Sequence, residues 1–119
     1  MPALILAVDD DQQILKLEKS FFERFGCTVM TAFNGPDALR LASLQPIDVV
    51  VLDFEMPDMD GAEVAARMRE IRPQALIIML SGGNIPAHAR TLVDGFIAKE
   101  NFSRSRLLPV IASLGAAAQ

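Results

Sequence analysis

The sequence predicts an α/β domain with a doubly wound, five-stranded parallel sheet, and three observations support this prediction. Apolar runs and amphipathic stretches alternate five times along 119 residues without a sequence repeat, a pattern typical of parallel strands joined by helices. Hydrophobic residues make up 51% of the chain, enough for a single compact domain over residues 1–119. The run at residues 75–80 is apolar throughout, so we expect helices to cover both faces of that strand.

Two strand and helix units occupy the first part of the chain. Residues 3–8 are the predicted first strand, and Asp11 then caps a helix that ends near Gly26. The apolar residues that recur at helical spacing in this helix are Ile14, Leu17, Phe21 and Phe25. The second unit combines a mixed strand at residues 28–33 with a helix that ends at Pro46.

The remaining part of the chain repeats the alternation three more times. The predicted elements are a strand at 47–53, a helix at 62–71, a strand at 75–80, a short helix at 87–93, a strand at 95–98 and a helix at 103–114. Little chain is left for the helix near residue 87, so we expect one or two turns there. Pro109 falls inside the last helix, which must therefore begin late or kink.

The strand order follows from how apolar each run is. Strands one, three and four are the purest apolar runs and belong in the middle, which leaves the mixed second strand and the short fifth strand at the edges. With right-handed crossovers the order becomes 2-1-3-4-5. In that arrangement the winding direction switches between strands one and three, and ligands bind outside the carboxyl ends of the strands at such a switch.

Polar residues follow the apolar runs at the predicted edge of the sheet. Asp53 ends the third strand, while Asp9 and Asp10 directly follow the first. Carboxylates this close raise one another's pKa unless a cation holds them together, so the sequence predicts an acidic pocket for a divalent metal. Ser81 follows the fourth strand and Lys99 the fifth, so five polar side chains are expected to share one rim.

These residue types fit phosphoryl transfer to a carboxylate. An aspartate can attack phosphorus if a metal and a fixed cation neutralise the charge on the phosphoryl oxygens. Asp9, Asp10 and Asp53 would hold Mg²⁺, which prefers oxygen ligands, and Asp53 would keep one oxygen for attack. Lys99 would pair with one phosphoryl oxygen and the Ser81 hydroxyl would donate to another.

Composition and charge argue against several other classes of protein. The net charge of −4 disfavours binding to the phosphates of nucleic acid, which requires clustered Lys and Arg. Cys27 and His88, the single cysteine and the single histidine, do not make a zinc set. The first apolar run is too short for a membrane span or a signal core, so we expect a cytoplasmic protein without membrane contacts.

The strand ends carry a set of motifs that resembles one known family. They are Val8-Asp9-Asp10, Leu52-Asp53 with Met56-Pro57 and Asp60-Gly61, Ser81-Gly82, and Phe96 three residues before Lys99. Together, and over nearly the whole chain, they resemble the response-regulator receiver domains of bacterial two-component signalling, in the stand-alone, chemotaxis-regulator form. The resemblance implies the flavodoxin-like receiver fold.

The resemblance also implies a role for each residue of the rim. Asp53 would be the phosphoacceptor, and the main-chain carbonyl of Glu55 would join the three aspartates as a metal ligand. Ser81 and Lys99 would bind the phosphoryl group, and Phe96 would be an aromatic switch that turns inward when Ser81 moves toward the phosphate. The implied phosphodonor is a sensor histidine kinase or a histidine phosphotransfer protein, with a further, unidentified protein downstream. The protein would catalyse only its own phosphorylation and dephosphorylation.

The chain departs from that family after the lysine. The family usually has a proline there, joined by a cis bond, and this chain has Glu100. A cis bond to a residue other than proline costs about 2.5–4 kcal/mol, so we expect a trans bond and a less well aimed Lys99.

Two alternative functions remain open on the sequence. One is a receiver-like interaction domain that is not phosphorylated, which the departure at Glu100 makes conceivable. The other is a small Mg²⁺-dependent aspartyl phosphatase in which Asp53 is the nucleophile and Glu55 the acid. The phosphatase is disfavoured because no stretch of the chain supplies a cap or a substrate-binding insertion.

Overall fold

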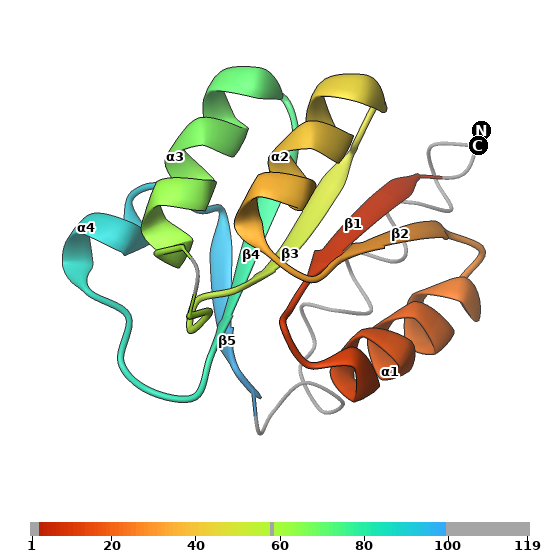
Figure 1. The fold of residues 1–119 in the computed structure, drawn as a ribbon, viewed down its shortest axis with the longest axis horizontal. Helices are drawn as coiled ribbons and strands as arrows, with labels where there is room; N and C mark the ends of the chain where they lie inside the picture. The colour runs from red at the N-terminus through yellow and green to blue at the C-terminus, as the bar shows by residue number, and fades with distance from the viewer. Residues whose placement is uncertain (1–2, 58, 100–119) are drawn as a thin grey trace.

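Strands and helices alternate along the chain in the predicted order. The computed structural model describes residues 3–57 and 59–99. The elements in these ranges are β1 (Leu4–Val8), α1 (Gln12–Glu23), β2 (Thr28–Ala32), α2 (Gly35–Leu44), β3 (Val49–Asp53), α3 (Gly61–Ile71), β4 (Leu76–Ser81), α4 (Ala87–Arg90) and β5 (Gly95–Ala98). Figure 1 shows the strands in the middle of the molecule, with helices on both sides of them.

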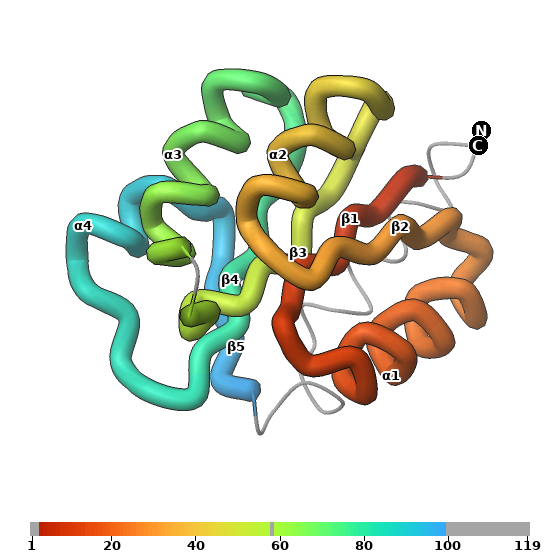
Figure 2. The backbone as a smooth tube through the Cα atoms, in the orientation of Figure 1, coloured from red at the N-terminus to blue at the C-terminus, as the bar shows by residue number. Residues whose placement is uncertain are grey.

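The five strands form one parallel sheet in the order β2-β1-β3-β4-β5, which confirms the predicted topology. β3 is buried at every position, and β1 and β4 at every position but the first, as expected for strands that are covered on both faces. Figure 2 follows the chain from β1 through α1 to β2, and then across β1 to β3, where the direction of winding reverses. All five strands therefore end along the same edge of the sheet.

Two hydrophobic cores lie on opposite faces of this sheet, because successive side chains of a strand point to opposite sides. α2 and α3 cover one face and α1 covers the other, as Figure 1 shows. Helix residues in the first core include Ala38 and Ala42 of α2 and Val64, Ala65 and Met68 of α3. Those in the second core include Leu15 and Phe22 of α1. The alternation along the strands thus fixes which helix packs on which face.

Polar side chains cap three of the helices. The caps are Asp11 for α1, Asn34 for α2 and Asp60 for α3. Each side chain accepts a hydrogen bond of 2.8 or 2.9 Å from a main-chain amide of the first turn. Asp11 and Asp60, both close in sequence to the predicted metal ligands, therefore fix helix starts. Each cap orients the helix that follows a strand end.

The orientation of α1 differs from the prediction. Leu17 is 69% exposed and Phe25, beyond the end of the helix, is 40% exposed, although both belong to the predicted apolar stripe. The residues that α1 buries are Leu15, Glu18 and Phe22. These form a neighbouring stripe of the helix surface at the same three- and four-residue spacing. The prediction of the buried stripe was wrong because the stripe that is actually buried contains a glutamate. The adjacent stripe contains only apolar residues and was therefore favoured.

Glu18 is a buried acid with no partner in the described ranges. Its side chain is 1% exposed, and neither of its carboxyl oxygens has a hydrogen-bond partner there. Burial, with a smaller contribution from the negative charges of Asp9 and Asp53, raises the pKa of Glu18 to about 8. The folded protein therefore holds a proton on Glu18 at neutral pH, which avoids the larger cost of a buried charge.

The element bounds agree with the predictions to within a few residues. β3 begins at Val49, two residues later than predicted, and β4 extends to Ser81. α4 is a single turn, as the short predicted segment allows. Glu100 and the predicted helix at 103–114, with Pro109, lie outside the described residues. None of the described helices has the length and apolar character that a membrane crossing requires.

Arg69 of α3 ties the beginning of β4 to the approach to β5. Its guanidinium donates to the carbonyls of Ala75 at 2.9 Å and Leu92 at 3.3 Å, and it pairs with the carboxylate of Asp94 at 2.8 Å. The same Asp94 oxygen accepts a hydrogen bond of 2.8 Å from the amide of Ile77. The pKa of Asp94 lies below its usual value because these hydrogen bonds outweigh its partial burial.

The raised pKa of Glu18 predicts an unusual pH dependence of stability. Between the ordinary pKa of 4.5 and about 8 only the folded state keeps the proton on Glu18, so the contribution of Glu18 to the free energy of unfolding falls as pH rises. Glu18 contributes a fall of up to about 1.4 kcal/mol for each pH unit in that window. Urea unfolding of Glu18→Gln between pH 5 and 8 is expected to show a shallower decline than the parent protein. The exposed Glu70→Gln is the matched control, and an unchanged decline in Glu18→Gln would contradict the prediction.

Candidate functional site

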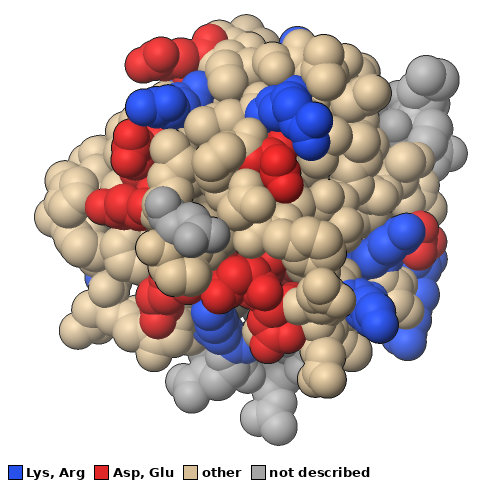
Figure 3. All heavy atoms as spheres, in the orientation of Figure 1, with Lys and Arg blue, Asp and Glu red and all other residues tan. Residues whose placement is uncertain are grey.

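The predicted site residues converge at the carboxyl edge of the sheet. Asp9 directly follows β1, Asp53 is the last residue of β3, Ser81 is the last of β4, and Lys99 directly follows β5. Parallel pairing of these strands brings their ends together. In the view of Figure 3, acidic side chains gather over the ends of β1 and β3 with a basic side chain beside them. The rim predicted from the strand ends is therefore present.

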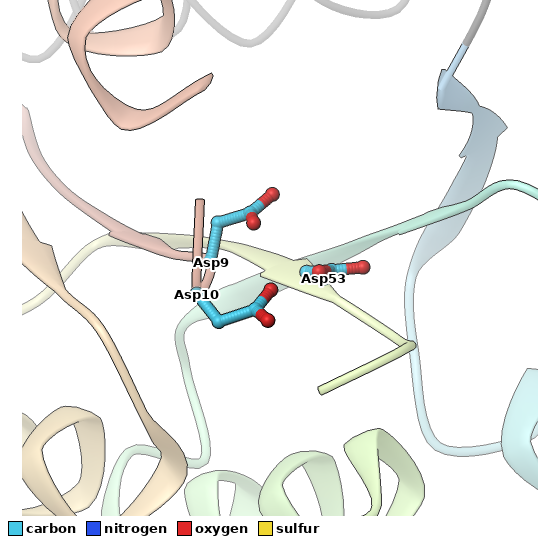
Figure 4. Close-up of side chains that lie close together, drawn as sticks. All are labelled: Asp9, Asp10 and Asp53. Atoms are coloured by element: carbon cyan, nitrogen blue, oxygen red, sulfur yellow. The ribbon is translucent and has the colours of Figure 1, made fainter. Parts of the chain in front are cut away.

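Three carboxylates form the acidic cluster of the site. One carboxylate oxygen each from Asp9, Asp10 and Asp53 lie within 4.8 Å of one another. Figure 4 shows the three side chains extending in the same direction, two from the segment after β1 and one from the end of β3. Asp9 and Asp53 are each 1% exposed, whereas Asp10 is exposed. The cluster thus opens to solvent on the side of Asp10.

Asp9 is held by the main chain and keeps one oxygen free. Its Oδ1 accepts a hydrogen bond of 2.9 Å from the amide of Asp11, and its Oδ2 has no partner in the described part of the chain. Burial raises the pKa of Asp9 to about 6, and the negative charges of Asp53 and Asp10 add to this effect. The raised pKa reflects the cost of negative charge that is not fully compensated.

Asp53 has one engaged oxygen and one free oxygen. Its Oδ1 accepts a hydrogen bond of 3.1 Å from the amide of Glu55 and pairs with Lys99 Nζ at 2.8 Å. Its Oδ2 has no partner among the described residues. Burial raises the pKa of Asp53 although both contacts favour its charged form. The free oxygen belongs to a carboxylate whose orientation is already fixed.

Lys99 reaches the acidic cluster, although from the sequence we expected its side chain to be less well aimed. Its side chain is 30% exposed, and its ammonium lies against Asp53. Partial burial by itself lowers the pKa of Lys99, but the hydrogen bond and the charge of Asp53, together with the charge of Asp9, raise it above its usual value. Lys99 therefore remains a cation at the rim.

Ser81 contacts Glu55, a contact that no pattern in the sequence predicts. The Ser81 hydroxyl lies 2.9 Å from Glu55 Oε1, and the amide of Gly82 donates to the same oxygen at 2.6 Å. These two donors lower the pKa of Glu55. A carboxylate that is stabilised in its charged form is a poor proton donor, which weighs against Glu55 as the acid of a phosphatase.

Phe96 lies apart from the acidic cluster. Its side chain is 47% exposed, and the guanidinium carbon of Arg90 lies 4.7 Å from the centre of its ring, a cation–π contact. A cavity of about 150 Å³ is lined by Phe96, Ser81, Ile85 and Arg90, among others. The ring is therefore outside the core, beside a space that also borders Ser81.

The donor set fits a hard divalent cation. Three carboxylates face one lysine, so negative charge is in excess at this point of the site. The unpartnered, buried Oδ2 of Asp9 supplies a ligand atom that no other described group uses. Oxygen ligands of this kind suit Mg²⁺, and a cation would stabilise the charged form of Asp9, whose pKa is raised mainly by burial and further by the charges of Asp53 and Asp10.

Several curated transcriptional regulatory proteins resemble this chain over much of its length. It is 36% identical over 86 residues to the transcriptional regulatory protein GlrR of Escherichia coli (strain K12). The aligned residues are 71% of this chain and 19% of GlrR. It is 33% identical over 113 residues to the transcriptional regulatory protein SrrA of Staphylococcus aureus (strain NCTC 8325 / PS 47), which covers 92% of this chain and 47% of SrrA. The chain thus spans between about a fifth and about half the length of these relatives.

Solved structures and a match to a protein family also relate this chain to known regulatory proteins. The response regulator protein TrrA from Thermotoga maritima, in complex with Mg²⁺-BeF, has a TM-score of 0.80 at 32% identity, with 94% of this chain and 98% of that chain covered. A chain in the complex of histidine kinase ThkA with TrrA has a TM-score of 0.82 at 32% identity, with 94% and 97% covered. The family described as response regulator receiver domain matches residues 5–112. Motifs, strand order and family match together show that the chain belongs to the response regulator receiver domain family.

Proposed function

We propose that this chain is a phosphoacceptor receiver in a two-component phosphorelay, which takes a phosphoryl group from a phosphohistidine onto Asp53. The observation that carries the proposal is the state of Asp53: a buried carboxylate at a strand end, with one oxygen paired to Lys99 and the other free. A nucleophile needs such a free oxygen, and the fixed cation stabilises the charge that gathers around it. The phosphorylated chain then acts by changing its contacts with other proteins.

Mg²⁺ is the cofactor that this proposal requires. Asp9, Asp10 and Asp53 would hold it, together with the main-chain carbonyl of Glu55. When bound, the ion neutralises charge on the carboxylates and on the phosphoryl oxygens. The close approach of the three carboxylates and the free Oδ2 of Asp9 support this assignment. TrrA, which is 32% identical to this chain, was crystallised with Mg²⁺-BeF.

In the transfer step Asp53 is the nucleophile, and Lys99 and Ser81 stabilise the phosphoryl oxygens. Asp53 Oδ2 attacks phosphorus, the new O–P bond forms as the P–N bond of the phosphohistidine breaks, and the bonding electrons leave with the imidazole, which takes up a proton. Lys99 contacts one phosphoryl oxygen and the Ser81 hydroxyl donates to another. The product is an acyl phosphate that water later hydrolyses, so the chain acts only on its own Asp53.

The response to phosphorylation is proposed to pass through Ser81 and Phe96. A phosphoryl group adds close to two negative charges and several acceptors, and this can draw the Ser81 hydroxyl toward it. The cavity between Ser81 and Phe96 offers space into which the exposed ring can turn. Inward movement of the ring would break its contact with Arg90 and change the surface around α4 and β5.

The proposed partners are proteins. The complex of ThkA with TrrA supports a sensor histidine kinase as the phosphodonor, and a histidine phosphotransfer protein presents the same chemical group. The downstream partner would read the surface that the switch alters. The net charge of −4 supports a protein rather than nucleic acid as that partner. We also propose the cytoplasm as the site of action.

Phosphorylation of Asp53 can be tested with a small phosphodonor. Incubation with acetyl phosphate and Mg²⁺ is expected to add one phosphoryl group, detected by intact mass, and the addition should vanish in Asp53→Asn and when the metal is chelated. Asp48→Asn is the matched control, because Asp48 directly precedes the same strand at the opposite edge of the sheet. Absence of the adduct in the parent protein, or its persistence in Asp53→Asn, would refute the proposal.

Removal of the lysine should slow the transfer without preventing metal binding. Lys99→Met is expected to lower the rate of phosphorylation by acetyl phosphate about 100-fold, the usual loss when one group that stabilises transition-state charge is deleted. The rate is measured by quantifying the adduct over time. Lys16→Met, which removes an exposed lysine of α1, should leave the rate unchanged. Equal rates for Lys99→Met and the parent protein would show that Lys99 does not contact the phosphoryl group.

A further inference from the structure

The side chain of Glu55 turns back over the loop that follows β4. Glu55 is itself exposed, but its carboxylate contacts Ser81, which is 2% exposed, and the main chain of Gly82. A Cβ atom added to Gly82 would lie 3.4 Å from Glu55 Oε2, so the carboxylate rests against bare backbone. The contact joins the loop after β3 to the loop after β4.

One oxygen of Glu55 engages two hydrogen-bond donors. Oε1 lies 2.9 Å from the Ser81 hydroxyl and 2.6 Å from the amide nitrogen of Gly82. The Ser81 hydroxyl has a single proton, for which the carbonyl of Gly83 at 3.0 Å is the alternative acceptor. The hydroxyl also accepts a hydrogen bond of 3.1 Å from the amide of Gly83. The single proton of this hydroxyl and one of its two acceptor lone pairs are therefore engaged in the resting protein.

We propose that Glu55 is a tethered competitor of the phosphoryl group, whose carboxylate occupies the donors of Ser81 and Gly82 until phosphorylation displaces it. The inference rests on the proposed function and assigns to Glu55 a positioning role, separate from that of its main-chain carbonyl. A carboxylate oxygen and a phosphoryl oxygen are both anionic acceptors, so the same donors serve either one. The tether keeps the competitor at a high effective concentration beside Ser81.

The charges around Glu55 explain how it can be displaced. Phosphorylated Asp53 carries close to two negative charges and stands only two residues from Glu55, so the two anions repel each other. Lys99 attracts both groups but has a single ammonium, which already lies against Asp53. Departure of Glu55 frees the Ser81 hydroxyl to turn toward the phosphoryl group. The competition therefore sets how readily the phosphorylated state forms and how long it lasts.

The test uses beryllofluoride, a non-reactive mimic of the phosphoryl group, with saturating Mg²⁺. Glu55→Ala is expected to bind it about tenfold more tightly than the parent protein, the effect of releasing one charge-assisted hydrogen bond. In a Ser81→Ala background the gain should shrink to below about threefold, because the shared donor is gone. Glu63→Gln, which removes an exposed carboxylate of α3, should change the affinity less than twofold.

Glu55→Asp distinguishes the effect of the hydrogen bonds to Ser81 and Gly82 from the effect of charge repulsion alone. Aspartate keeps the negative charge but is one methylene group shorter, so it should bind beryllofluoride like Glu55→Ala if the contact matters. Aspartate behaving like the parent protein would overturn the inference. In the resting protein, the amide proton resonance of Gly82 should move upfield in Glu55→Ala as its hydrogen bond is lost, and this readout needs no phosphorylation.

Two further outcomes would overturn the inference, and they differ from each other. If the parent protein binds beryllofluoride and takes phosphate from acetyl phosphate, but Glu55→Ala binds no more tightly, Glu55 is only a loop anchor. Loss of thermal stability in Glu55→Ala without any gain in affinity would have the same meaning. If the parent protein neither binds beryllofluoride nor becomes phosphorylated, the proposed function itself fails, and the role of Glu55 fails with it.

Discussion

The ion pair between Lys99 and Asp53, at 2.8 Å, places a cation against a carboxylate that is almost completely buried. Asp9 and Asp10 add negative charge within 4.8 Å of the same point, and burial already raises the pKa of Asp53. Without Lys99 the cluster would favour protonated carboxyl groups, which are poor nucleophiles and poor metal ligands. The ammonium compensates only part of the charge, which leaves the cluster suited to a divalent cation.

Much of the fold and the position of the site could be predicted because they depend on local sequence patterns. The apolar runs identified all five strands, and their purity distinguished central from edge strands. Parallel pairing then forces every residue at a strand end to the same edge, so Asp9, Asp53, Ser81 and Lys99 could be brought together without knowledge of any contact. Caps such as Asp60 were equally local, since a cap bonds to the helix that directly follows it.

Features that depend on side-chain rotation or on long-range packing could not be predicted. The stripe that α1 buries contains Glu18, and no count of apolar residues would select a stripe with an acid in it. The contact of Glu55 with Ser81 joins two loops 26 residues apart, and its existence depends on how both loops bend. The exposed ring of Phe96 contacts Arg90, which belongs to a different element. Each of these features depends on contacts between segments that are distant in the sequence or on the rotation of a side chain.

Arg69 and Glu55 hold the two ends of the segment between β4 and β5. Arg69 binds Leu92 and Asp94 near the second end, while Glu55 binds Ser81 and Gly82 at the first. Between these two anchors the only helix is the single turn α4, so the surface there is formed mainly by loop residues. A protein that docked on it would meet irregular turns rather than a long helical ridge, and recognition would depend on how these two anchors hold the loops.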